Sequence, residues 1–277
     1  MFRRLAPLLA VAGALAAVPA ANAAYPTPFA SQDGSGVLSL DGSIRFTAQK
    51  AGANTLVAAV RAKDGSTVRS QTISGAFGIP MLTQNGYMGG LFHDGSAFVL
   101  QNMGVENTSK FVILGSEDLG ARTTISLKGT FGFDALSPDG SRLYLIQHMS
   151  TQDIQHYVVR AYDLIDHALL PGRIADKTQK SWVMQGSAVS RLETPDGRWA
   201  YTLYANPGGY PFIHALDTVR SVAHCIGLPW KRAEQGPVFN FDLSLKGDRI
   251  AVKWQDGRTW RLVNRTSWRV STPARTR

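Results

Sequence analysis

Three charged residues in the middle of the chain have the types and spacing of a small ion-pair cluster. Arg191 and Glu193 are two residues apart, so in a β-strand their side chains lie on the same face. Asp134 occupies the place corresponding to Arg191 in the preceding copy of an internal repeat. A guanidinium with two carboxylates can clamp a polar ligand, or it can hold two neighbouring elements together. Both interpretations stay open, and the structural ion pair is favoured.

Two histidines bracket a polar loop that is a second candidate for binding. His148 and His156 flank residues 149–155, a segment longer and more polar than the tight turns elsewhere in the chain. The alternative is an ordinary solvated loop. The lone Cys225 cannot form an internal disulfide, and its neighbour His224 would point to the opposite face of a strand. We therefore expect no thiol catalysis here.

Local signatures of common enzymes are absent from the sequence. It contains no Gly-x-Ser-x-Gly elbow, phosphate-binding glycine loop, His-Glu-x-x-His motif or calcium loop. This counts against the hydrolases, nucleotide-binding proteins and zinc proteases that carry such motifs, although an enzyme built from scattered residues remains open. Asp134 and Glu193 supply few oxygen ligands for a divalent cation, and we expect no metal and no cofactor.

The elements that would position these residues follow from an internal repeat. A turn motif ending in glycine recurs five times, and the four steps between residues 42 and 247 average about 51 residues. Asp-Gly between two apolar runs indicates a tight β-hairpin, because both residues tolerate positive φ angles. The five turns are Ser39–Gly42, Phe92–Gly95, Ser137–Gly140, Thr194–Gly197 and Ser244–Gly247.

Each turn is followed by a second hairpin, so one period holds four short strands. Four antiparallel strands repeated around an axis form the blade of a β-propeller, whose blades bury one another's faces. We therefore predict an all-β fold, a single β-propeller domain over residues 25–277 with five four-stranded blades. The alternatives are a β-sandwich, or a sixth blade formed by Tyr25–Gly36 together with the C-terminus.

One copy of the repeat resembles a known family. Residues 133–145, which read FDALSPDGSRLYL, are similar to the repeat of bacterial YVTN-type and WD-repeat-like propellers. Residues 159–164 and 213–218 resemble the third strand of those repeats, which runs into an acidic turn. The resemblance implies the propeller fold. Those families include binding platforms, assembly scaffolds and some lactone hydrolases, so it implies no single chemistry.

Three segments are longer than a blade requires. We expect Gly75–Gly90, Asp176–Gly186 and Pro229–Gly236 to join consecutive blades on one face of the ring, and the loop Tyr204–Tyr210 to lie on the opposite face. Aromatic and basic residues grouped on a face suit protein or glycan binding, and the candidate contacts are Trp182 and Trp230. The alternative is a packed cap over the channel.

Residues 1–24 have the layout of a cleaved signal peptide: two arginines, a short apolar run and small residues at the cut. No other stretch is long and apolar enough to cross a bilayer. Cleavage would leave twenty-seven basic and twenty acidic residues, a net charge of +7, of which +6 lies in residues 248–277. We therefore expect an extracytoplasmic monomer with no nucleic-acid partner.

The function favoured by these features is non-enzymatic. We predict a binding or scaffold module of the cell envelope whose partner is a protein or glycan of unknown identity. The alternative is a lactonase-like hydrolase with its site at the mouth of the channel.

Overall fold

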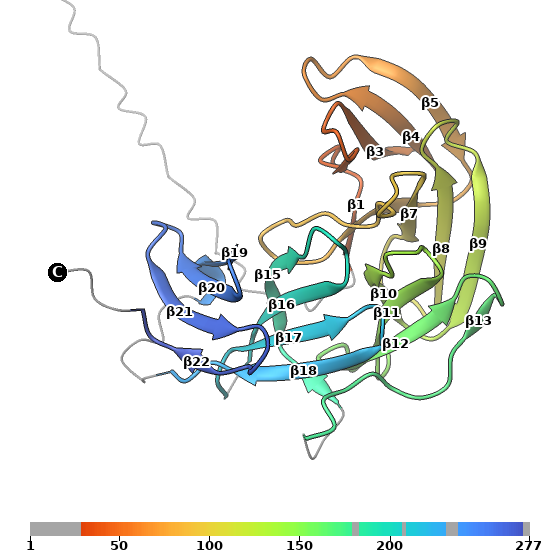
Figure 1. Ribbon diagram of the computed structural model, residues 1–277. Coiled ribbons are helices and arrows are strands. Elements are labelled where there is room, and N and C mark those ends of the chain that lie inside the picture. Colours follow the sequence, from red (N-terminus) through yellow and green to blue (C-terminus); the bar gives the residue numbers. More distant parts are fainter. Residues whose placement is uncertain (1–28, 179–182, 207–208, 231–237, 274–277) are drawn as a thin grey trace, which may run out of the picture.

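The chain folds almost entirely into antiparallel β-sheets. The computed structural model describes residues 29–178, 183–206, 209–230 and 238–273. The predicted signal peptide and Trp182 lie outside them. Five sheets follow one another along the chain, and Figure 1 shows them arranged in succession around an arc, with β3–β5 near one end and β19–β22 at the other. One short 3-10 helix, Val238–Asn240, precedes the last sheet.

The five sheets are the blades of a β-propeller. Blade one contains β2 (Val37–Leu38), β3 (Ile44–Ala51), β4 (Asn54–Arg61) and β5 (Thr67–Ile73). Blade two contains β1 (Phe29–Ser31), β6 (Phe77–Met81), β7 (Ala97–Asn102), β8 (Thr108–Gly115) and β9 (Ala121–Lys128). Blade three contains β10 (Phe131–Leu136), β11 (Arg142–His148), β12 (His156–Asp163), β13 (Ala168–Leu169) and β14 (Met184–Gln185). Blade four contains β15 (Ser187–Glu193), β16 (Trp199–Ala205), β17 (Phe212–Asp217) and β18 (Val222–Gly227). Blade five contains β19 (Phe241–Lys246), β20 (Arg249–Trp254), β21 (Thr259–Asn264) and β22 (Val270–Ser271).

The five predicted turns are confirmed. In every copy the turn glycine has a positive φ angle, between 58° and 73°, which other residues adopt only at a cost. In the first four copies the glycine N–H donates to the carbonyl oxygen of the residue three positions earlier, at 2.8–3.0 Å. The turn joins the first two strands in blades one, three, four and five, and in blade two, where β1 is an additional strand, it lies between β6 and β7. The repeat in the sequence is therefore the structural repeat.

Two sheets depart from the expected four strands. The N-terminal strand β1 pairs with β6, so its residues join blade two and do not begin a sixth blade. Strand β14 pairs with β12 at the edge of blade three. Part of Gly75–Gly90, expected as a connection, is strand β6. Phe77 and Ile79 are buried in the core between blades one and two, and this burial outweighs the turn-forming glycines and Pro80 around them.

Hydrophobic clusters join neighbouring blades. One cluster links blades one and two, another blades two and three, two more blades three and four, and the largest blades four and five. Hydrogen bonds reinforce these interfaces: the Tyr144 hydroxyl of blade three donates to the Thr218 carbonyl oxygen of blade four at 2.6 Å. Among the residues described, no such cluster joins blade five to blade one.

Candidate functional site

The turns between the first two strands of blades one to four meet at the centre of the molecule. We call these four turns, which end in Gly42, Gly95, Gly140 and Gly197, the inner turns. The side chain of Leu40 lies against Gly95, and that of Phe92 lies against Gly140. The imidazole of His93 reaches Gly197, where an added Cβ would lie 2.6 Å from the ring. Blades two and four are not neighbours in the arc, so the contact between His93 and Gly197 shows that the inner turns lie close together around the central axis.

The segment between β6 and β7 also crosses to blade four. After β6 the chain runs toward β15, and the Gln84 N–H donates to the Ala188 carbonyl oxygen at 3.0 Å. It then returns to blade two through Gly89 and Gly90, and Leu91 forms a bridge with Phe98. Figure 1 shows this segment extending toward β15. Part of Gly75–Gly90, for which a packed cap was the alternative to a binding surface, therefore reaches across to blade four.

A small pocket lies among the inner turns, and we call it the central pocket. Its volume is about 200 Å³, and four blades contribute to its wall. Most of its lining residues have apolar or aromatic side chains, and they stand beside exposed backbone groups, the carboxylate of Glu193 and the imidazole of His93. The lining residues are Val37, Leu40, Tyr87, Met88, Gly89, Gly90, Leu91, Phe92, His93, Phe133, Leu136 and Glu193.

Arg191 lies beside this pocket and is saturated with hydrogen bonds. Its side chain is 1% exposed, and it donates to Asp134 Oδ1 at 2.8 Å and to the Asp134 carbonyl oxygen at 2.8 Å. It also donates to Thr202 Oγ1 at 2.7 Å and twice to Glu193 Oε1, at 3.2 and 3.0 Å. A guanidinium has five N–H donors, and all five are used. Arg191 is therefore a clamp between blades three and four.

The clamp, which comprises Arg191, Asp134 and Glu193, carries one surplus negative charge. Burial opposes the charge on Arg191, but Asp134 and Glu193 outweigh it and raise the pKa of the guanidinium. Two carboxylates then face one cation. Glu193 is the partly open member, with 28% of its side chain exposed, against 5% for Asp134. Burial and the charge of Glu193 raise the pKa of Tyr87, which also lines the central pocket, to about 12.

Next to the clamp lie two further titratable side chains, the buried His214 and the partly exposed Cys225. Burial lowers the pKa of His214 to about 4, although the charge of Asp134 acts in the opposite direction. Burial also raises the pKa of Cys225 to about 12, and its sulfur lies 3.7 Å from His214 Nδ1. The histidine nearest the thiol is thus its cross-strand partner in β17. Both groups are neutral at pH 7, and Cys225 also lines a hollow between blades three and four.

The two candidate histidines do not form a common surface. His148 is 2% exposed, and its Nδ1 lies 2.8 Å from the Ile154 carbonyl oxygen. His156 is exposed and pairs with Asp153 at 2.9 Å. Trp230 is 9% exposed and packs edge-to-face against Trp260, inside the core between blades four and five. The contacts of His148 and Trp230 are packing contacts, and a binding role for the three residues stays a prediction.

A larger hollow lies between blades three and four, and its lining corrects one prediction. It measures about 790 Å³ and includes Met184 from the connection after blade three and Tyr210 from the loop in blade four. Gln185 Nε2 donates to Asn206 Oδ1 at 3.1 Å, which joins the two segments. The loop Tyr204–Tyr210 was expected on the opposite face. That was wrong, because strand direction alternates within a blade, so both connections emerge at the same end of the strands.

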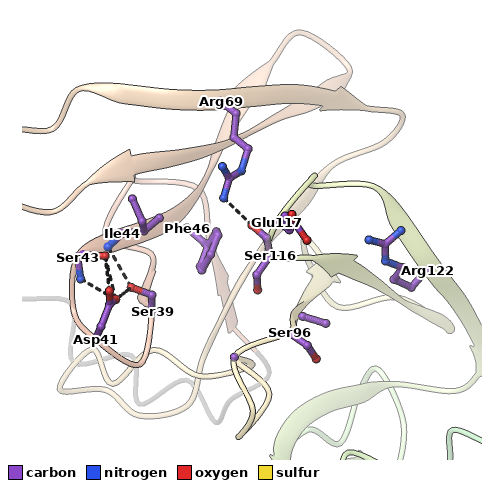
Figure 2. Close-up of a pocket in the computed structure, with 12 residues that line it drawn as sticks. Ser39, Asp41, Ser43, Ile44, Phe46, Arg69, Ser96, Ser116, Glu117 and Arg122 are labelled. Carbon is purple, nitrogen blue, oxygen red and sulfur yellow. Dashed lines mark hydrogen bonds between the residues drawn. The ribbon is translucent and has the colours of Figure 1, made fainter.

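A third hollow, of about 620 Å³, lies between blades one and two and is shown in Figure 2. Arg69 of β5 points across it, and its guanidinium donates to the Ser116 carbonyl oxygen at 3.0 Å. On the other side Asp41 accepts hydrogen bonds from Ser39 and Ser43 at 2.6–3.1 Å. These bonds lower the pKa of Asp41 to about 2, and its oxygens are engaged in shaping the turn.

Sequence reasoning missed most of the central pocket. The sequence places His93 in a hairpin turn, where a solvated side chain is the usual expectation, whereas it lies against the turn of blade four. A usable signal was present: the glycines of the inner turns leave room for a side chain from another blade.

Among the described residues, no group of three or more His, Cys, Asp or Glu side chains could hold a metal ion. Within the same residues, no helical segment has the length and hydropathy needed to cross a bilayer.

The topology and the centrally converging turns define a β-propeller. No family model and no curated protein matches the chain. Similar solved structures include TolB from Acinetobacter baumannii, with 11% identity, a TM-score of 0.46, and coverage of 85% of this chain and 52% of the TolB chain. The β-propeller domain of Cps50 (Swd1) from Myceliophteria thermophila has 8% identity, a TM-score of 0.48, and coverage of 87% and 67%. The protein thus spans about half the length of that TolB chain, and the likeness concerns the fold alone.

Proposed function

We propose that this protein is an exported, non-enzymatic β-propeller that binds a protein partner of the cell envelope at the inner turns. The supporting observation is the convergence of four blades on one pocket. Leu40, at its rim, is 65% exposed, and Leu38 beside it is 40% exposed. Exposed apolar residues around a pocket that several elements build are typical of a binding surface. Export is inferred from residues 1–24.

The chemistry of the pocket favours binding over catalysis. Arg191 has no donor left for a substrate, because Asp134, Thr202 and Glu193 use all five. The second candidate is the lactonase-like hydrolase, and one observation favours it: Glu193 and His93 line the same pocket and could act as an acid and base pair. Turnover of a lactone that is lost in Glu193→Gln and His93→Gln would establish that function and refute the binding proposal.

Site-specific cross-linking tests the proposal. A photoreactive amino acid replaces Leu40, at the inner turns, and in a matched control replaces Val105, which is 41% exposed in the connection between β7 and β8 at the other end of the strands. Both variants are expressed in the native host and irradiated. We expect a discrete cross-linked protein from position 40 and none from position 105. Identical products from both positions, or none from position 40, would contradict the proposal.

A further inference from the structure

We propose that the central pocket receives one basic side chain, a lysine or an arginine, that the partner protein inserts between the inner turns. This inference rests on the proposed function and specifies what the pocket recognises. It assigns Glu193 as the residue that pairs with the cation, and the aromatic side chains of the wall as its apolar surroundings.

The charge of the site is the first argument. The clamp contains two carboxylates and one guanidinium, so it holds one net negative charge close to the pocket wall. Both hydrogen bonds that Glu193 accepts from Arg191 are to its Oε1 atom. Its carboxylate therefore keeps acceptor capacity for a second donor, since each oxygen has two lone pairs. An anion at this position would be repelled, and an incoming cation would complete the neutralisation of the cluster.

The aromatic wall is the second argument. Tyr87, Phe92 and Phe133 line the pocket beside Glu193. The faces of aromatic rings attract ammonium and guanidinium groups, and the attraction strengthens where water is excluded. Met88 and Leu91 complete a surface that suits the aliphatic stem of a long basic side chain. The pocket thus sets several aromatic rings and one carboxylate beside the imidazole of His93, and the carboxylate with the rings suits an organic cation.

Size and overall charge decide the form of the cation. The volume of about 200 Å³ is below the roughly 300–1,000 Å³ of sites for free small molecules, and suits one side chain. After the predicted cleavage the chain has a net charge of +7, of which +6 lies in residues 248–277. The electrostatic field of the protein therefore does not concentrate free cations from solution. A basic residue on a docked partner is instead held at the pocket by the rest of the interface.

The test uses amino-acid probes, so that it does not depend on knowing the partner. Nα-acetyl-lysine methylamide and Nα-acetyl-arginine methylamide are the cationic probes, and Nα-acetyl-norleucine methylamide is the neutral one of similar shape. Binding is measured by saturation-transfer NMR and by titration of backbone amide shifts. We expect saturable binding of at least one cationic probe, with shifts at residues of the inner turns, and binding of the norleucine probe at least about tenfold weaker.

Two variants and a control assign the roles. Glu193→Gln keeps an acceptor for Arg191 and should weaken the cationic probe at least about tenfold. Phe92→Leu keeps an apolar wall and leaves the clamp intact, and should weaken the same probe about two- to fivefold while the norleucine probe is unaffected. Glu117→Gln, at an exposed carboxylate in the hollow between blades one and two, should change nothing.

The outcomes separate this inference from the proposed function. Binding of both cationic probes no tighter than that of the norleucine probe, or unchanged binding in Glu193→Gln with the native circular dichroism spectrum, would overturn the cation pocket. If the cross-link at position 40 persisted in that case, the proposed function would stand alone. Loss of that cross-link in Glu193→Gln, together with weaker probe binding, would support both. Probe binding without any cross-linked protein would overturn the assignment to a partner's side chain.

Discussion

Replacement of Arg191 by methionine should destabilise the protein strongly. Methionine fills much of the same volume but leaves the carboxylate of Asp134, 5% exposed, without its cation. Breaking a buried ion pair by removing one partner costs about 3–5 kcal/mol, because the remaining charge stays desolvated. A domain with about 5–15 kcal/mol of total stability would lose about a fifth or more of it. Glu193 contributes less to this cost, since its side chain reaches water.

The double variant Asp134→Asn/Arg191→Met separates lost charge from lost packing. Replacing a buried pair by neutral residues is often close to neutral in stability, so the second substitution should recover a large part of the loss. Stability is measured by urea unfolding, with the midpoint and slope compared between variants. Arg258→Met is the control, because its partner Asp256 lies in an exposed turn. If Arg191→Met were no more destabilising than this control, or if the double variant lost the sum of both single effects, the buried-clamp reasoning would be refuted.

Three further predictions test other parts of the molecule. Gly197→Ala should destabilise the protein more than Gly42→Ala in urea unfolding. Both glycines have φ near +70°, but only the Cβ of an alanine at position 197 would strike His93. Adding His93→Ala should remove the difference between the two variants. The pKa of His214 falls from 6.5 to about 4 on folding, so the unfolded chain binds the extra proton and stability should decrease as pH falls from 6.5 to 4. This loss of stability, at most about 3 kcal/mol, should be smaller in His214→Phe. A His214→Phe variant with the same pH dependence of stability as the unsubstituted protein would contradict the prediction. Sequencing of the exported protein should give an N-terminus within one residue of Ala24, whereas an intact Met1 would refute the signal peptide.

The blades were predictable because their signals are local. A glycine with positive φ between two apolar runs specifies a hairpin whatever surrounds it, and all five such turns are present where the repeat places them. The pairing of Arg191 with Glu193 is local in the same sense, since residues two apart in a strand share a face. The contact between Asp134 and Arg191 needed one more step, which was the equivalence of positions in neighbouring blades.

The central pocket was not predictable from such signals. Strand β6 contains a proline and a glycine, and its burial depends on the apolar face of blade one, which no local pattern reveals. The crossing of the next segment to Ala188 joins residues about a hundred positions apart. Nothing near Tyr87 in the sequence indicates Glu193 as a neighbour. Contacts of this kind come from the closure of several blades on one axis, and a repeat predicts that closure only in outline.

The distribution of charge connects the clamp to recognition. A cleaved chain of net charge +7, with +6 of it in residues 248–277, would be expected to attract anions, yet the described core near its axis holds two carboxylates around one arginine. Surface charges are screened over about 8 Å at physiological ionic strength, whereas charges in a partly enclosed pocket are screened less. The basic surface therefore governs approach, and the acidic centre governs which side chain is accepted once a partner has docked. Raising the salt concentration should then weaken encounter with the partner more than it weakens the contact of a basic side chain with Glu193.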